Sequence, residues 1–340
     1  MSTTVNKNQS YQDFLKQKHA TFNTPEELIE QMVQKATGLK MVQKTKLILG
    51  ESHEVYDVEV EKGMHIIVRI SHETDRRPFE AENWAFEQCK KVNVPVPEII
   101  LLEHTENEGR PVSFCIEKKI EGIVMDQIYK TISQERVKNI LRQLGQILSR
   151  LHAVPTKGFG AIEEDGKGFR KTWAEYMTKY KEEQKSLFEM ADLIGMEKKK
   201  IDNALDILSN HTQIYVTVAA QLVHNDLGPK HIFLDNTDTI VGIIDMEWPM
   251  GATPLYEFAR WDFFRPSLPY QWIQDGYTNQ KIFEDNNFRA HFELMKLHLS
   301  LQHLEYYESE KNVAGVEMSR KNLEKGLSFF FSDNASNRGV

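Results

Sequence analysis

The sequence has little cysteine, no long apolar run and no excess of basic residues. Its two cysteines, Cys89 and Cys115, are far apart and form no CxxC pair, so neither a disulfide framework nor a four-cysteine metal site can be built. No stretch approaches the roughly 18 uncharged apolar residues of a membrane helix, and the polar first residues lack the apolar core of a signal peptide. We therefore expect a soluble cytoplasmic protein with no membrane partner.

Acidic residues outnumber basic ones, with 50 Asp and Glu against 42 Lys and Arg and a formal charge of −8. Basic surface supplies most of the affinity for a phosphate backbone, so we expect no nucleic-acid partner. The balance suits a cationic ligand, although net charge alone does not identify one. At roughly 150 residues per domain, 340 residues are enough for about two domains. We expect a monomer or a homodimer.

The first third of the sequence combines helical stretches with short strand patterns. Thr24-Pro25-Glu26-Glu27 is typical of a helix start, in which Thr24 and Glu27 form a capping box, and Gly38 is expected to end this helix. Apolar and polar residues alternate from Tyr56 to Glu61, the pattern of a half-buried strand. We predict an antiparallel sheet of about five strands with one inserted helix at 77–91. The expected strands are 41–49, 56–61, 65–70, 99–103 and 112–117.

Helical patterns dominate after residue 117. A long helix has one apolar face, and Thr172-Trp173-Ala174-Glu175 offers a second capping box. Strand patterns return at 214–223, 232–234 and 240–244. We therefore predict an α+β fold with an N-terminal lobe at 1–117 and a mainly helical C-terminal lobe at 118–340. The apolar face of the long helix consists of Val137, Ile140, Leu141, Leu144, Leu148 and Leu151.

Polar residues that can carry chemistry follow short apolar strands between Leu222 and Asp245. Loops that leave such strands are where sites are usually built. A hairpin that turns at 236–238 would bring Asp245 back beside Asp226. The stretch contains four residues of metal-binding types, so a metal-dependent hydrolase is one interpretation. These four residues are His224, Asp226, His231 and Asp245.

Several segments between residues 47 and 262 follow one another in the order of a known family. His224-Asn225-Asp226 is similar to an HxD catalytic loop and Ile244-Asp245 to a metal-binding segment. The set resembles the aminoglycoside phosphotransferase family, which shares the protein-kinase-like fold. The other similar segments are Gly50–Tyr56, Arg69, Glu82 at 13 residues before Pro95, Leu151–Pro155 and Thr253–Glu257. Within the family, Leu222–His224 with Asp226, and Phe263–Pro266, are similar to the hygromycin B phosphotransferases.

This resemblance implies a bilobal kinase that transfers the γ-phosphoryl group of ATP or GTP, with Mg²⁺, to a hydroxyl of a small molecule. Asp226 would orient that hydroxyl and take its proton, while His224 braces the loop. Asp245 and His231 would hold the metal. Among possible acceptors, an aminoglycoside or similar cationic compound comes first, and a sugar, amino alcohol or macrolide remains open.

The nucleotide would be bound mainly by residues of the N-terminal lobe. Arg69, oriented by Glu82, would contact the α- and β-phosphates, and Ser52 lies in the loop that would cover them. The adenine would bind to backbone groups of Glu117-Lys118-Lys119. The competing interpretations are a surface strand position for Arg69 and a solvated helix face for Glu82.

His231 departs from the family, which usually has Asn at the second metal position. Mg²⁺ prefers oxygen ligands, whereas imidazole suits later transition metals. His231 could bind a metal directly, act through water or leave one site weak, so a catalytically silent nucleotide-binding protein is a third interpretation. Three carboxylates nearby in sequence could form an acidic acceptor pocket or simply be exposed. They are Glu247, Glu257 and Asp262.

Overall fold

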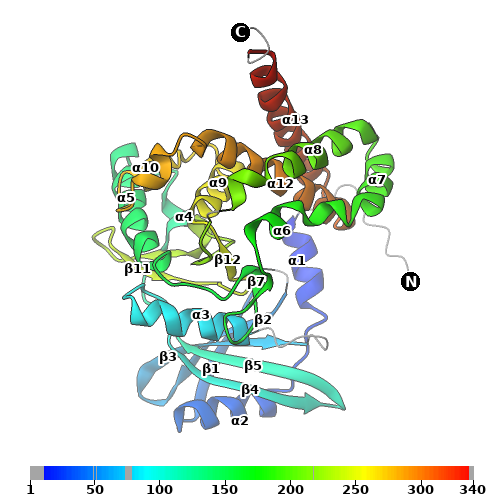
Figure 1. The fold of residues 1–340 in the computed structure, drawn as a ribbon. Helices are drawn as coiled ribbons and strands as arrows, with labels where there is room; N and C mark the ends of the chain where they lie inside the picture. Colours follow the sequence, from blue (N-terminus) through cyan, green and yellow to red (C-terminus); the bar gives the residue numbers. More distant parts are fainter. Residues whose placement is uncertain (1–10, 49, 51, 73–78, 217, 337–340) are drawn as a thin grey trace.

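The computed structural model describes residues 11–48, 50, 52–72, 79–216 and 218–336. An antiparallel sheet forms the lower part of the molecule in Figure 1, and a larger, mainly helical part lies above it. The predicted α+β fold, with an N-terminal five-stranded sheet and a helical C-terminal lobe, is confirmed.

The N-terminal sheet has the strand order β1-β2-β3-β5-β4, with all neighbours antiparallel. Helix α2 (Glu26–Thr37) covers one face, where its buried Ile29 and Val33 join the apolar side chains of the strands. Helix α3 (Glu80–Lys91) lies on the other face, between the sheet and the helical lobe (Figure 1). The strands are β1 (Met41–Leu47), β2 (Glu54–Val60), β3 (Met64–Ser71), β4 (Ile99–Asn107) and β5 (Arg110–Lys118).

Helix α3 connects the two lobes. Its buried Ala85, Phe86 and Cys89 belong to the apolar core of the helical lobe. The Cys89 Sγ atom lies 3.8 Å from Sδ of Met246, a residue of the segment that follows Asp245. The helix was predicted at 77–91, and the first two of these residues lie outside the described part of the chain.

The N-terminus of α2 differs from the prediction. The helix ends at Gly38 as expected, with this glycine at φ 72°, but Pro25 is its N-cap and no side chain caps it. The Thr24 hydroxyl instead donates to Glu54 Oε2 at 2.6 Å, 30 residues along the chain. Burial of the Glu54 carboxylate makes this tertiary hydrogen bond more favourable than a local cap. A short preceding helix, α1 (Tyr11–His19), was not predicted.

The helical lobe begins with the long amphipathic helix that was predicted, α5 (Gln134–Leu151), whose six expected apolar residues are all buried. The second capping box is also present, since Thr172 and Glu175 cap α6 (Trp173–Thr178) reciprocally. The remaining α-helices are α4 (Met125–Ile128), α7 (Gln184–Leu193), α8 (Lys198–Asn210), α9 (Pro254–Phe264), α10 (Gln271–Gln274), α11 (Lys281–Glu284), α12 (Phe288–Ser309) and α13 (Val313–Ser336). No helix of the described residues is long and apolar enough to cross a membrane.

Two small sheets in the helical lobe position the polar loops. One has the order β11-β10-β6 and the other β8-β7-β12-β9. The strand predicted at 214–223 is only partly correct, because Thr212–Tyr215 forms a 3₁₀ turn (η3) and the strand starts at Gln221. The strands are β6 (Ile123–Val124), β7 (Phe159–Ile162), β8 (Gly168–Arg170), β9 (Gln221–Val223), β10 (Ile232–Leu234), β11 (Ile240–Ile243) and β12 (Met250–Ala252), and further 3₁₀ turns are η1 (Glu61–Gly63), η2 (Lys179–Lys181) and η4 (Pro229–His231).

Candidate functional site

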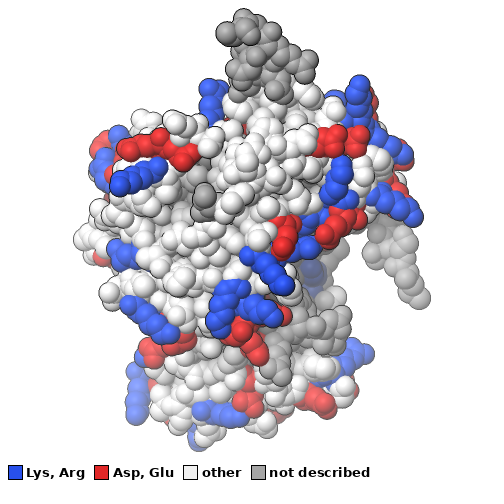
Figure 2. All heavy atoms as spheres, viewed as in Figure 1, with Lys and Arg blue, Asp and Glu red and all other residues white. Residues whose placement is uncertain are grey.

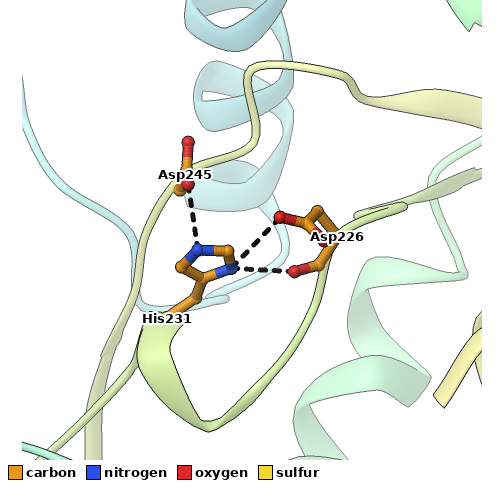
Figure 3. Close-up of side chains that lie close together, drawn as sticks. All are labelled: Asp226, His231 and Asp245. Carbon is orange, nitrogen blue, oxygen red and sulfur yellow. Dashed lines mark hydrogen bonds and ion pairs between the residues drawn. The ribbon is translucent and has the colours of Figure 1, made fainter. Parts of the chain in front are cut away.

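Asp226, His231 and Asp245 converge from two loops of the helical lobe (Figure 3). Asp226 follows β9, His231 ends the turn η4, and Asp245 follows β11. The predicted hairpin of β10 and β11 returns the chain, so that Asp245 Oδ2 lies 2.9 Å from His231 Nε2. The other ring nitrogen, Nδ1, lies 2.8 Å from the Asp226 carbonyl oxygen. Since a carbonyl only accepts, Nδ1 carries the hydrogen in this contact.

The backbone of this segment is held in unusual conformations. Asn225 has φ 68° and Asp245 has φ 67°, both in the left-handed region that residues other than glycine rarely adopt. Such conformations persist where surrounding contacts over-determine them, and they cluster at functional sites. His224 supplies one such contact, because its Nδ1 accepts from Asp226 N at 3.3 Å and its Nε2 donates to Ile244 O at 2.9 Å. The expectation that His224 braces the loop is confirmed.

Glu257 of α9 forms hydrogen bonds with the backbone of the same loop. Its Oε2 accepts the backbone N–H of His224 at 2.6 Å and that of Asn225 at 3.4 Å. Burial raises the pKa of Glu257 to about 7, although both hydrogen bonds favour the ionised form. The side chain is only 2% exposed and therefore cannot serve an open acceptor pocket.

Arg69 and Glu82 form a buried ion pair above Asp245. Arg69 Nη1 donates to Glu82 Oε2 at 2.6 Å, and Nη2 lies 4.0 Å from Asp245 Oδ1. The Glu117 carboxylate is 3.9 Å from the same guanidinium. Both competing interpretations were therefore wrong, because Arg69 and Glu82 are 8% and 0% exposed rather than solvated. Three carboxylates surround one guanidinium, an arrangement that suits an additional cation.

The charges of this cluster shift its pKa values in different directions. Burial raises the pKa of Glu82 to about 8. The charge of Arg69 lowers this pKa, and the neighbouring carboxylates cancel part of that lowering. Burial alone would also raise the pKa of Asp245, but the hydrogen bond and charge of His231, together with Arg69, hold it well below its usual range. For Asp226, Lys230 and His231 lower the pKa despite burial. Both aspartates are therefore ionised at neutral pH.

Two predicted nucleotide-binding residues lie outside this cluster. Ser52 is exposed in the loop between β1 and β2, of which residues 49 and 51 are outside the described part of the chain. Lys119 pairs with Asp57 Oδ2 at 2.8 Å, which holds its side chain against β2. The neighbouring His53 is buried, however, and its Nε2 lies 2.9 Å from Glu247 Oε2.

Positive side chains surround Asp226 on its open side. Lys230 Nζ lies 3.4 Å from Asp226 Oδ2, and Arg260 Nη2 lies 3.9 Å from Oδ1. Arg265 packs against the loop at Gly228, where an added β-carbon would come within 2.0 Å of its Nη2. The sequence held a signal for these residues, since Lys230 lies inside the catalytic motif and both arginines follow Thr253–Glu257. That these positive charges lie beside Asp226 was not predicted.

Neither interpretation of the three nearby carboxylates is correct, because they form no acidic acceptor pocket and are not simply exposed either. Glu247 pairs with His53, Glu257 binds the loop backbone, and Asp262 pairs with Lys296 at 2.9 Å. On the face in Figure 2, acidic and basic side chains are interspersed over both lobes. This face therefore shows no concentrated acidic patch.

Comparisons with known proteins identify the family and the fold. Residues 45–268 match the model of the phosphotransferase enzyme family. No curated protein sequence matches the chain. A crystal structure of aminoglycoside phosphotransferase APH(4)-Ia with ADP and hygromycin B is similar at TM-score 0.68 and 19% identity, over 88% of this chain and 98% of that one.

Two other solved structures have a similar fold. A putative fructosamine-3-kinase from Thermobifida fusca aligns at TM-score 0.62 and 18% identity, over 87% of this chain and 98% of that one. The complex of gentamicin with APH(2")-IIa aligns at TM-score 0.58 and 15% identity, over 89% and 97%. At these identities the likeness establishes the fold, which is the bilobal kinase-like fold that the sequence predicts.

Proposed function

Because the chain belongs to the phosphotransferase enzyme family, we propose that it transfers the γ-phosphoryl group of ATP or GTP to a hydroxyl of a small molecule. The observation that carries this proposal is the convergence of Asp226, Asp245 and Arg69. Phosphoryl transfer needs mainly positioning and neutralisation of charge. One carboxylate for the acceptor, a donor set for a cation and a guanidinium for phosphates meet those needs.

Asp226 is the proposed base for the acceptor hydroxyl. Its carboxylate is ionised, because neighbouring positive groups lower its pKa, and it is 40% exposed, so a ligand can reach it. Glu257 and His224 fix the backbone on which it sits. An oriented carboxylate accepts the hydroxyl proton as the oxygen attacks phosphorus.

The donors around Asp245 fit a divalent cation. One ligand atom from each of Asp226, His231 and Asp245 lies within 4.8 Å of the others. Two carboxylates suit Mg²⁺, whereas the imidazole nitrogen of His231 also suits Mn²⁺ or Zn²⁺. With Nδ1 hydrogen-bonded to Asp226, His231 directs Nε2 toward Asp245, where it can face a cation. A bound cation would neutralise charge on the nucleotide phosphates.

Arg69 is the proposed contact for the α- and β-phosphates, and Glu82 orients it. Ser52 is proposed to lie over the phosphates. The backbone of 117–119 would bind the base, with the Glu117 and Lys119 side chains held by Arg69 and Asp57. Residues 1–117 would then form the nucleotide lobe and 118–340 the acceptor lobe. The cytoplasmic location and the monomeric or homodimeric state stay predictions.

The acceptor expected from the sequence is an aminoglycoside or similar cationic compound. The similar solved structures support a small polyhydroxylated acceptor, since they include complexes with hygromycin B and gentamicin. The fructosamine-3-kinase supports acceptors outside the antibiotics. The charge of the acceptor is a separate matter, because the side chains beside Asp226 are basic.

The test is release of ADP or GDP from the purified chain with Mg²⁺ and a panel of cationic, neutral and anionic hydroxyl compounds. Asp226→Asn should lower turnover by about 10³-fold while nucleotide still binds. Asp262→Asn is the matched control, since its carboxylate pairs with Lys296 instead. Equal turnover in the wild type and Asp226→Asn would contradict the proposed role, and nucleotide binding without turnover of any acceptor would favour a silent protein.

A further inference from the structure

Three basic side chains lie beside the loop that carries Asp226, the carboxylate of the proposed acceptor site. Lys230 and Arg260 approach the two carboxylate oxygens of Asp226 at 3.4 and 3.9 Å. Arg265 lies against the same loop at Gly228. One negative charge cannot neutralise three positive ones. The nearest buried carboxylate, Glu257, is already occupied by backbone N–H groups.

Arg265 is the basic group with no anion of its own. Its guanidinium stacks on the Trp261 ring, 5.4 Å from the centroid, and none of the carboxylates in the described part of the chain forms an ion pair with it. Burial and the charge of Arg260 lower the pKa of Arg265, while Asp226, Glu257 and Tyr307 oppose that effect. A partly buried guanidinium without an anion lowers the stability of the fold, because its desolvation is not compensated. Such a group is expected to bind an anion from outside the chain.

Tyr307 of α12 interacts electrostatically with this basic region. Burial and the charge of Asp226 raise the pKa of Tyr307, while the charges of Arg260 and Arg265 lower it. Its ring packs on Gly315 of α13, where an added β-carbon would come within 2.4 Å of the ring. The region therefore has two guanidiniums and an ammonium as donors, a set that matches oxyanions.

We infer that the acceptor carries an anionic oxygen group, a phosphate or a carboxylate, which Arg265 binds while the acceptor hydroxyl meets Asp226. This inference rests on the proposed phosphotransfer at Asp226. Arg260 and Lys230 add to the positive field at the same place. A polycationic acceptor would bring like charges next to these side chains and lose affinity.

The basic residues could instead serve the γ-phosphate of the nucleotide, and the experiment must separate the two. AMP-PNP with Mg²⁺ fills the γ-phosphate position. The loaded protein is then titrated with inorganic phosphate, with acetate and with kanamycin, by calorimetry and thermal shift. Phosphate or acetate should bind to the loaded wild type and raise its Tm, and which of them binds more tightly tells the phosphate and carboxylate acceptors apart.

Arg265→Met should weaken this anion binding by roughly tenfold, because a charged hydrogen bond is lost. Arg289→Met is the matched control, since Arg289 also stacks on a ring, that of Phe329 at 5.1 Å, but lies on another helix. Gly228→Ala should weaken anion binding as well, because the new methyl group displaces the Arg265 guanidinium without removing its charge.

Two results would overturn the inference. One is anion binding that is absent from the loaded wild type or unchanged in Arg265→Met. The other is kanamycin binding that exceeds anion binding and does not respond to Arg265→Met. A protein that fails to bind AMP-PNP at all would contradict the proposed function itself, and that outcome is separate because nucleotide binding is measured first.

Discussion

The imidazole of His53 and the carboxylate of Glu247 make a buried contact between the two lobes, with Nε2 and Oε2 2.9 Å apart. His53 ends the loop proposed to cover the nucleotide, and its ring packs 4.9 Å from that of Phe79. Glu247 comes two residues after Asp245. The pair therefore fixes the distance between the covering loop and the proposed metal site.

Loss of this pair should loosen the loop. We expect His53→Ala to raise the KM for nucleotide about tenfold, equivalent to about 1.4 kcal/mol, with a smaller change in kcat. Steady-state kinetics and a double-mutant cycle with Glu247→Gln measure the coupling. His104→Ala, which removes a histidine bonded to Ser113 on the sheet, is the control. Additive effects of His53→Ala and Glu247→Gln would refute the coupling.

Glu257 should matter through the backbone rather than through charge. Glu257→Ala leaves the buried His224 N–H without its acceptor, which costs about 1–3 kcal/mol, and we expect a lower Tm and a kcat reduced by at least tenfold. Glu257→Gln retains an acceptor oxygen and should preserve most of the activity. If both variants lose activity equally while remaining folded, the carboxylate has a different role.

The His231 side chain should set the preference for metal. His231→Asn replaces a nitrogen donor by an amide oxygen, which Mg²⁺ prefers. We expect the ratio of kcat/KM with Mg²⁺ to that with Mn²⁺ to rise roughly tenfold. Activity titrated with each metal at saturating nucleotide measures this ratio. A ratio that does not change would show that His231 does not ligate the metal.

The free energy of unfolding should depend on pH through the ionisation of Glu54. Burial alone raises the pKa of this carboxyl, but hydrogen bonds from His72, Thr24, Tyr56 and Lys46 lower it from 4.5 to about 2. Its stabilisation is therefore complete above pH 4.5 and is lost as the pH falls toward 2. The shift corresponds to at most roughly 3 kcal/mol.

Urea denaturation midpoints of the wild type and Glu54→Gln should accordingly differ at pH 7 and converge as the pH falls from 4.5 toward 2. The control is Glu103→Gln, which removes a surface ion pair with Lys35 worth at most about 1 kcal/mol. A difference that stays constant from pH 7 to pH 3 would argue against the ionised, hydrogen-bonded state of Glu54.

Sequence patterns predicted those parts of the fold that interactions between neighbouring residues determine. The apolar face of α5 and the Thr172 capping box were correct because side chains three and four residues apart specify them. The Thr24 cap was wrong because its hydroxyl found a buried acceptor from another strand. The strand predicted at 214–223 was wrong in part. Residues 212–215 form the 3₁₀ turn η3, and β9 begins only at Gln221.

For the candidate site too, the sequence predicted one part and could not predict another. Motif order was enough to place Asp226, His231 and Asp245 together, since the intervening hairpin is short. It could not show that Glu247 and Glu257 are occupied, because their partners are His53 and a backbone N–H distant in sequence. Both interpretations of these carboxylates, an acidic pocket and plain exposure, failed for this reason, and the charge beside Asp226 became visible only in three dimensions.

The scarcity of cysteine gives this protein an internal reporter of lobe motion. Cys89 is buried where α3 meets Met246, so a thiol reagent can reach it only when this contact opens. Cys115 is buried in β5, next to Arg69 in the sheet register. Pulsed alkylation of the unmodified chain would therefore time the opening of the interlobe contact at Cys89 against the exposure of the sheet at Cys115. No label or engineered residue is needed for this measurement.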